Sequence, residues 1–304
     1  MKMSRVNTAA PVLTLAYTFL GLVAALMLFG CTTRPAAHDT PPEPAVTSED
    51  PARMEPGKDG VRTFGVLRKL MHQGETAGVV RLTDIVPGPH AYGLGAVAEL
   101  NGEVTIVDDQ VWLSYPTDDG GTRTVHDTTS DEQAALLVTA NVDAWSEFPL
   151  EHDLTLDQID AFLARQAEQA GIDTEQPFPF LVVGKLRQLN LHVIDGRKLP
   201  GGPSSHAEHL QAAVQIQREN VDGRLIGFFS TRHHGVFTHH SSNTHIHVVL
   251  PDEKLSGHVD NVTIAKEAIL MLPAEGPYLK NQHGDGEFGQ VSRKAGNRSG
   301  RGQG

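Results

Sequence analysis

The chain has 304 residues, a formal net charge of −12 and a single cysteine. An acidic surface repels nucleic-acid phosphates and anionic lipid headgroups, which argues against nucleic acid as a partner. One cysteine rules out an internal disulfide framework and a Cys-rich zinc ribbon, while 39% hydrophobic residues suffice for one large domain or two small ones.

The first thirty residues resemble a bacterial lipoprotein signal peptide. Lys2 and Arg5 form a basic start, an apolar run covers about residues 12–29, and Gly30 precedes Cys31. In such signals a small residue comes before the cysteine that is lipidated and becomes the new N-terminus. The alternative is an uncleaved signal-anchor helix, because about 18 apolar residues also span a bilayer. The position of the only cysteine favours lipidation, and both interpretations predict export.

A tether and a tail are predicted on either side of a folded body. Residues 31–60 contain six prolines among acids and small residues, a composition that cannot bury enough apolar surface to fold. Residues 281–304 are rich in glycine and carry four Lys or Arg residues, which predicts a flexible tail. The body is expected at 61–280. Acyl chains on Cys31 would hold it to a bacterial membrane, at the periplasmic face or the cell surface.

The body is predicted to begin with a helix and to continue as a β-meander. Apolar residues recur at helical spacing from Phe64 to Met71, and Gly74 is placed to end this helix. Short alternating segments follow over residues 92–115. Asn101-Gly102 between two of them is a strong hairpin signal, because both residue types tolerate positive φ. Glu103 is then the first residue after the tight turn.

A second helix and a series of strands are predicted in the second half of the body. The helix covers about residues 156–170, with Thr155 as its N-cap and Gln158 completing a capping box. Strands follow at about residues 180–194, 223–230, 244–250 and 257–264. His192 lies on the polar face of the first of these strands, a face that meets solvent or lines a pocket.

The predicted fold class is α+β, in two closely packed lobes of mixed or antiparallel β-sheet with flanking helices. The lobes are expected at about residues 61–150 and 151–280. Together they form the single folded body between the tether and the tail.

Seven of the 16 histidines fall between residues 233 and 258. His245 and His247 are two apart on a predicted strand, so both side chains project from the same face. If the chain turns back at residues 251–254, His258 on the returning strand lies across from His245. Three neutral imidazoles then converge with one coordination position open, which is typical of a catalytic zinc site.

These residues also have structural interpretations. A His-x-His pair is a weak signal in a chain so rich in histidine, and it is His258 on a returning strand that favours a metal site. The four histidines between residues 233 and 240 belong to an irregular segment and are expected in an exposed loop rather than as ligands. Glu103, taken alone, is interpreted as a solvated carboxylate beside a turn.

Three blocks of the sequence, in order, resemble the α-acetolactate decarboxylase family. Thr244–His247 followed by Ser256–Asp260 resembles the family signature "yHlHF…GGHV", with the same intervals between the three histidines. Residues 92–103 are similar to its "fGlGTf…LdGE" segment, and Gly223–Phe228 is similar to its "GtivGF" strand. The resemblance covers about residues 61–273.

The resemblance implies a reaction and a set of site residues. The family binds a divalent metal, usually zinc, and converts α-acetolactate to acetoin and CO2, which implies a carboxy-lyase acting on a small molecule. His245, His247 and His258 take the positions of the metal ligands. A carboxylic acid delivers a proton after CO2 leaves, and Glu103 is the candidate donor. Because family members commonly pair, the resemblance also implies a homodimer.

The sequence departs from the family pattern at three points. His192 occupies the position of an arginine that helps to hold the substrate, and a histidine cannot grip a carboxylate bidentately. Ala96 stands where the family has a threonine. The late catalytic glutamate has two candidates, Glu275 and Glu287, and no motif distinguishes them.

The first hypothesis is therefore decarboxylation of α-acetolactate, or of a related 2-hydroxy-3-keto acid, with His192 and Glu103 as catalytic residues. A second hypothesis is a tethered protein of the same fold that binds a metal or a small acid without this catalysis. A third is another metal-assisted lyase or isomerase, which the sequence does not separate from the first.

Overall fold

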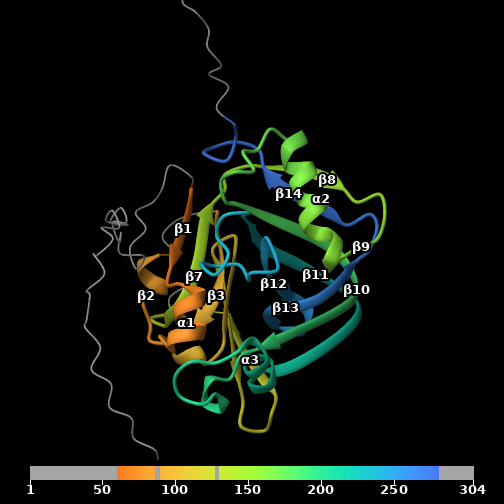
Figure 1. The fold of residues 1–304 in the computed structure, drawn as a ribbon. Coiled ribbons are helices and arrows are strands. Elements are labelled where there is room, and N and C mark those ends of the chain that lie inside the picture. Colours follow the sequence, from red (N-terminus) through yellow and green to blue (C-terminus); the bar gives the residue numbers. More distant parts are fainter. Residues whose placement is uncertain (1–59, 86–89, 127–129, 281–304) are drawn as a thin grey trace, which may run out of the picture. The chain divides into compact units, whose positions relative to one another are not determined.

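The computed structural model describes residues 60–85, 90–126 and 130–280 (Figure 1). The predicted signal peptide, Cys31, most of the tether, the tail and Glu287 lie outside these residues. Within them the chain forms two seven-stranded sheets and three α-helices, and all pairings between the named strands are antiparallel. No helix in this described part combines the length and the apolar character needed to cross a membrane. The predicted α+β class is confirmed.

The first sheet contains the predicted β-meander. Its strands, in spatial order, are β1 (Val61–Phe64), β7 (Gln133–Asn141), β3 (Ala91–Val97), β4 (Glu103–Val107), β5 (Gln110–Pro116) and β6 (Thr122–His126), and β2 (Val80–Arg81) pairs with β7. The turn between β4 and β5 consists of Asp108 and Asp109, with φ values of 50° and 66°. Positive φ at both central residues is what a two-residue hairpin of this kind requires.

The tight turn predicted at Asn101-Gly102 is wrong. A 3-10 helix, η2 (Ala98–Leu100), lies between β3 and β4, and Asn101 has a φ of −91°. Of the pair, only Gly102 has a positive φ, at 133°, and a Cβ there would lie 2.2 Å from the carbonyl oxygen of Ser114. Glycine is therefore required by close packing on β5. Glu103 still begins β4, as expected.

The second sheet closes partly on itself. Its strands, in spatial order, are β8 (Trp145–Pro149), β14 (Ile269–Pro273), β10 (Phe178–Val193), β11 (Val214–Phe229), β12 (Thr244–Leu250), β13 (Leu255–Ile264) and β9 (Leu154–Thr155). Because β13 pairs with β10 as well as with β12, the strands β10, β11, β12 and β13 form a closed ring. All four strands predicted beyond residue 180 are present, and β11 begins earlier than predicted.

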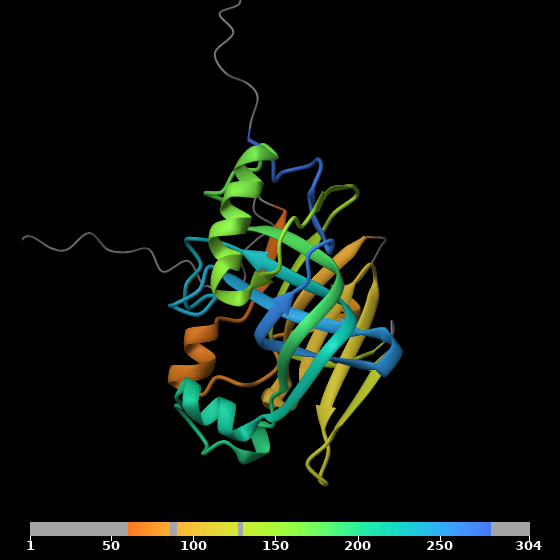
Figure 2. The same ribbon diagram turned by 90° about the vertical axis from the view of Figure 1, so that its right-hand side faces the viewer.

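The helices are α1 (Leu67–Gln73), α2 (Leu156–Gln169) and α3 (His206–Ala212). Gly74 ends α1 in the left-handed conformation, as predicted, but Phe64 belongs to β1, because Gly65 with a φ of 77° separates the strand from the helix. The predicted capping box of α2 is confirmed, with the Gln158 side chain accepting a hydrogen bond from the Thr155 backbone N–H. Figure 2 shows α1 and α3 next to each other and away from α2.

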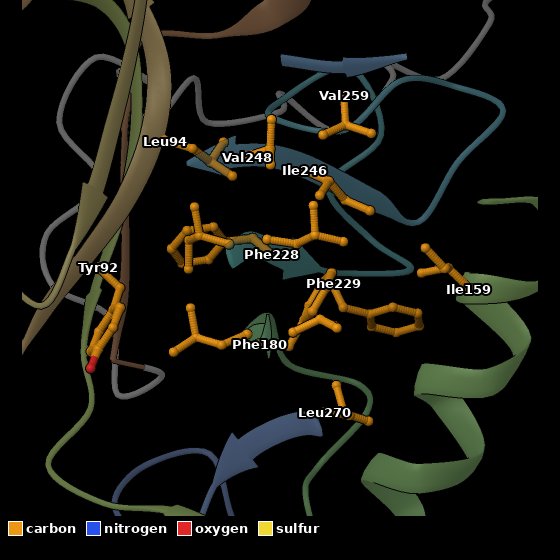
Figure 3. Close-up of a cluster of buried hydrophobic side chains, with 14 of the residues drawn as sticks. Tyr92, Leu94, Ile159, Phe180, Phe228, Phe229, Ile246, Val248, Val259 and Leu270 are labelled. Atoms are coloured by element: carbon orange, nitrogen blue, oxygen red, sulfur yellow. The ribbon is translucent and has the colours of Figure 1, made fainter. Parts of the chain in front are cut away.

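One hydrophobic core joins the two sheets and α2 (Figure 3). Leu94 of β3 lies against Phe228 of β11 and Val248 of β12, and all three side chains are fully buried. Ile159 of α2 belongs to the same cluster. Burial of this shared apolar surface stabilises the packing of β3 and its neighbour β4 against β11 and β12.

Candidate metal centre

The three predicted histidine ligands lie on two neighbouring strands. His245 and His247 are on β12, where a spacing of two residues places both side chains on one face, and His258 is on β13. His258 pairs with His247, whereas the sequence predicts a pairing with His245. The turn is centred later than expected, because Leu250 pairs with Leu255 and a 3-10 helix lies between them. A shift of two residues keeps all three side chains on the same face.

The three imidazoles converge. His245 Nε2 lies 3.1 Å from His258 Nδ1, and one ring nitrogen from each of the three residues lies within 4.8 Å of the others. His247 is fully buried, and its Nδ1 is 2.9 Å from the hydroxyl oxygen of Thr105 on β4. Its other nitrogen, Nε2, is buried and has no hydrogen-bond partner among the described residues. A buried nitrogen with a free lone pair fits a metal ligand.

Burial keeps these three imidazoles neutral. It lowers the pKa of His245 to about 3 and lowers the pKa values of His247 and His258 well below the ordinary value for histidine. Mutual repulsion between the rings in their charged forms acts in the same direction. Near neutral pH the cluster therefore offers unprotonated nitrogens, the form in which histidine binds a metal.

Glu103 faces the histidine cluster from the first sheet. It is only 4% exposed, and its Oε1 accepts a hydrogen bond of 3.1 Å from the backbone N–H of Ile194. Its Oε2 lies 3.7 Å from His247 Nε2. Burial raises the pKa of the Glu103 carboxyl to about 7, although the charge of His192 and the Ile194 N–H act in the opposite direction. Glu103 therefore retains a proton close to neutral pH, unlike the solvated carboxylate of the alternative interpretation.

His192 lies beside both groups. It pairs with His258 across β10 and β13, and the two ring centroids are 4.7 Å apart. Its Nδ1 is 2.8 Å from Asp260 Oδ1, and its Nε2 is 3.9 Å from Glu103 Oε1. Burial alone lowers the pKa of His192, but the hydrogen bond to Asp260 and the charges of Asp260 and Glu103 outweigh it and raise the pKa.

A pocket of about 70 Å³ opens beside these residues. Glu103, His192, His245 and His258 line it, and so does Ala96 at the position of the family threonine. Apolar side chains from α1, α3 and the first sheet form much of the remaining wall. None of the lining residues is a lysine or an arginine. Any anionic substrate must therefore be held by hydrogen-bond donors, a metal or charged imidazole.

Glu275, the one late acid candidate that the structure describes, is not at this pocket. It is exposed and follows β14. Glu287 and Cys31 lie outside the described residues. Of the four histidines expected in an exposed loop, His239 instead lines the pocket, with its ring 6.2 Å from that of His258. The prediction that His239 is exposed in a loop is therefore wrong, because this loop lies beside the histidine cluster.

Asp260, Thr105 and two histidines of α3 belong to the site but are not predicted from the sequence. Asp260 and Thr105 each lie two residues beyond a predicted site residue on the same strand, so the alternation of a strand could have indicated both. His206 and His209 line the pocket from α3, a helix that no strong apolar period marks in the sequence.

The family model for alpha-acetolactate decarboxylase matches residues 64–291. No curated protein matches the chain. Among solved structures, a Staphylococcus aureus protein of unknown function, described as similar to alpha-acetolactate decarboxylase, has 17% identity and a TM-score of 0.56. That match covers 69% of this chain and 84% of the other.

Two acetolactate decarboxylase structures from Bacillus subtilis are similarly close. The structure from subspecies spizizenii has 13% identity and a TM-score of 0.57, and the match covers 70% of this chain and 85% of the other. The structure from strain 168 has 14% identity and a TM-score of 0.55, with 72% and 91% covered. At these identities the comparison shows a shared fold.

Proposed function

Because the chain belongs to the alpha-acetolactate decarboxylase family, we propose that it converts α-acetolactate, or a related 2-hydroxy-3-keto acid, to acetoin or its analogue and CO2. In this reaction the bond to the carboxylate carbon breaks, and its electron pair moves toward the neighbouring carbonyl oxygen. A proton then adds to the carbon that lost CO2. The site must therefore stabilise negative charge on oxygen and supply one proton.

The observation that most supports this proposal is the convergence of three neutral imidazoles beside one buried carboxylic acid, with His245, His258 and Glu103 lining one pocket and His247 buried next to Glu103. His245, His247 and His258 would hold a divalent metal, which we propose to be zinc because three imidazole ligands suit that ion. When bound, the metal would stabilise the negative charge that develops on the substrate oxygens.

Glu103 is the proposed proton donor. Its Oε1 is held by the Ile194 N–H, which leaves Oε2 on the side of the histidine cluster. A pKa of about 7 suits general acid catalysis near neutral pH, because the group holds a proton but releases it readily. The neighbouring apolar wall excludes water, so that the proton goes to the substrate carbon.

His192 is proposed to orient the substrate. Asp260 holds its Nδ1 and so fixes the ring, and Nε2 is on the side of Glu103. From there the imidazole can donate one hydrogen bond to an anionic substrate oxygen. Arginine would donate two, so we expect a substrate that is held more loosely at this point than a bidentate contact would allow.

The direct test is an acetoin assay on purified protein that comprises the body and the tail, residues 60–304, loaded with zinc. We expect acetoin from acetolactate, and we expect His245→Ala to abolish it. His152→Ala is the matched control, because His152 is exposed and does not line the pocket, and it should retain full activity. Absence of acetoin at every metal loading would exclude this activity.

A non-catalytic, tethered binding protein is the second candidate. The absence of lysine and arginine from the residues that line the pocket favours it, because an anionic substrate lacks a permanent positive charge to bind. This protein would retain a metal tightly, and Glu103→Gln and the wild type would both be inactive with every 2-hydroxy-3-keto acid tested.

We also propose that the protein is exported and anchored through acyl chains on Cys31, and that it forms a homodimer. The leader sequence supports lipid anchoring. The dimer is proposed because members of the family commonly pair. Replacing Cys31 by serine should remove a metabolically incorporated fatty-acid label from the protein. Light scattering of the purified body should give the mass of two chains.

A further inference from the structure

Two side chains of strand β4 lie next to the two ring nitrogens of His247. Glu103 and Thr105 are two residues apart on β4, so both side chains project from the same face, toward β12. Glu103 Oε2 lies 3.7 Å from Nε2 of His247, and the Thr105 hydroxyl oxygen lies 2.9 Å from its Nδ1. Two residues of one strand in the first sheet, Glu103 and Thr105, therefore lie next to a single imidazole of the second sheet.

The contact between Thr105 and His247 is closed to water. Both residues are 0% exposed, and in the described part of the chain the Thr105 hydroxyl is the one side-chain group that hydrogen-bonds His247 Nδ1, while the backbone of Val104 on the same strand also hydrogen-bonds the His247 ring. A neutral imidazole carries one proton, on either Nδ1 or Nε2. If the proton is on Nδ1, it is donated to the Thr105 oxygen and Nε2 keeps a free lone pair. If it is on Nε2, that nitrogen cannot bind a metal.

We propose that Thr105 is a positioning residue that holds His247 in the tautomer protonated on Nδ1 and keeps Nε2 available to a divalent cation. This inference rests on the proposed metal site. The unpartnered state of Nε2 supports it, because in a buried site a polar nitrogen without a partner is otherwise unfavourable. Acceptors that orient a ligating histidine through its second nitrogen have a strong effect on metal affinity.

The same geometry also directs Nε2 of His247 toward the Glu103 carboxyl. Because Glu103 and Thr105 share one strand face, the ring orientation that satisfies Thr105 also turns Nε2 toward Glu103. Rotation of the ring by half a turn would break the hydrogen bond to Thr105 and direct Nε2 away. The hydroxyl of Thr105 thus sets the direction of His247 relative to both the cation and the proton donor.

The test is the zinc affinity of Thr105→Val, measured by competition with a chromophoric chelator. Valine has nearly the shape of threonine but removes the hydroxyl oxygen that lies 2.9 Å from Nδ1, so we expect affinity to fall by about 10- to 100-fold. Thr105→Ser restores the hydroxyl and should return the affinity to near that of the wild type. Equal affinities for Thr105→Val and the wild type would overturn the inference.

Thr139→Val is the matched control. Thr139 is a buried residue of β7 in the same sheet, 3% exposed, and its hydroxyl oxygen has no hydrogen-bond partner in the described part of the chain. The change of a buried hydroxyl to a methyl group is therefore the same, but no histidine is involved. Zinc affinity should be unchanged, and an equal loss in both variants would indicate a general packing effect and overturn the inference.

A second measurement needs no variant. Nitrogen-15 NMR of the zinc-loaded wild type should show the His247 ring protonated on Nδ1 and bound to the metal through Nε2. A ring protonated on Nε2 would overturn the inference even if Thr105→Val failed to fold. Neither measurement uses turnover, so loss of affinity in a protein that forms no acetoin would contradict the proposed function alone. A wild type that binds no zinc would contradict both.

Discussion

At the scale of single residues, Glu103 shows how the site combines function with a loss of stability. The carboxyl is almost fully buried, and the only hydrogen bond to it in the described structure comes from the Ile194 N–H. Burial raises its pKa to about 7, so the ionised form is disfavoured in the folded protein. A proton donor near neutral pH requires this environment, and an isolated surface carboxylate could not provide it.

Glu103→Gln is expected to lower kcat for acetoin formation by about 100- to 10,000-fold, the usual contribution of general acid catalysis. Glutamine keeps the size and the carbonyl acceptor of the side chain but cannot deliver the proton. Zinc content, measured by elemental analysis, should remain one equivalent. Glu99→Gln is the control, because Glu99 lies four residues away, is exposed and does not line the pocket. Unchanged kcat in Glu103→Gln would exclude Glu103 as the donor.

The same variant makes a prediction about pH and stability. A carboxyl whose pKa is raised on folding contributes stability below its unfolded pKa of 4.5, and this contribution is lost as pH rises through about 7. In metal-free protein, Glu103→Gln should therefore gain stability relative to the wild type between pH 5 and pH 8, by about 2.5 kcal/mol. Urea unfolding at the two pH values measures the difference. If the variant and the wild type differed in stability by the same amount at pH 5 and pH 8, this result would contradict a buried, protonated Glu103.

At the scale of elements, the turn between β12 and β13 determines which histidines face each other. The alternation of a strand predicts that His245 and His247 share a face, but it does not reveal where the chain turns. The 3-10 helix at Pro251–Glu253 and Lys254 with a φ of 48° place the turn so that His247 meets His258. Since the shift is an even number of residues, the prediction of a shared face survives the error in register.

Gly257 allows β13 to approach β10 at the site. A Cβ at this position would lie 2.5 Å from the backbone oxygen of His192, so Gly257→Ala must move His258 away from His192. We expect a loss of about 1–3 kcal/mol in the free energy of unfolding, together with weaker zinc binding. Denaturant unfolding and a chelator competition test the two effects.

Gly201→Ala is the control for that variant. Gly201 is exposed, and an added Cβ there would have no neighbour within 4 Å, so stability and zinc affinity should both be retained. Wild-type zinc affinity in a folded Gly257→Ala protein would show that the close approach of these strands does not determine the geometry of the site.

The start of helix α1 is capped by a distant loop, which the local sequence does not predict. Gly74 predicts its end, but no side chain caps its start. The backbone N–H groups of Leu67 and Arg68 instead donate to the carbonyl oxygens of Val236 and Gly235, in the loop that also carries His239. A cap formed by a loop so distant in sequence leaves no local signature, so neither this contact nor the position of His239 at the pocket could be predicted.

At the scale of the whole molecule, polar contacts connect the two sheets around the site. Thr105 of β4 contacts His247, Ser114 of β5 lies 2.8 Å from Ser256 of β13, and the Ile194 N–H reaches Glu103. A metal that binds only the folded protein should therefore stabilise both sheets together, since its ligands and their supports belong to both.

Removal of the metal is expected to lower the melting temperature of the entire body in one transition. At a zinc concentration 1,000-fold above Kd, bound metal adds about 4 kcal/mol to the free energy of unfolding. Calorimetry with zinc and with EDTA measures the difference, and His247→Gln should melt at the same temperature in both. Equal melting temperatures for the wild type under the two conditions would contradict a metal bound at this site.

Much of this protein follows from local sequence pattern. Alternating residues predict β10, a capping box predicts the start of α2, and the interval between His245 and His247 on a predicted strand predicts two imidazoles on one face. These features depend on interactions within one strand or one helical turn. The choice of side chain is therefore sufficient to specify them.

The assembly of the site depends on tertiary structure. Thr105 and His247 are 142 residues apart, and Glu103 and His247 belong to different sheets. No spacing within a strand specifies such a contact, because it forms only when both sheets bury their apolar faces in a common core. The sheet packing decides that Glu103 is a buried acid with a raised pKa, and that His192 is held by Asp260 rather than exposed to solvent.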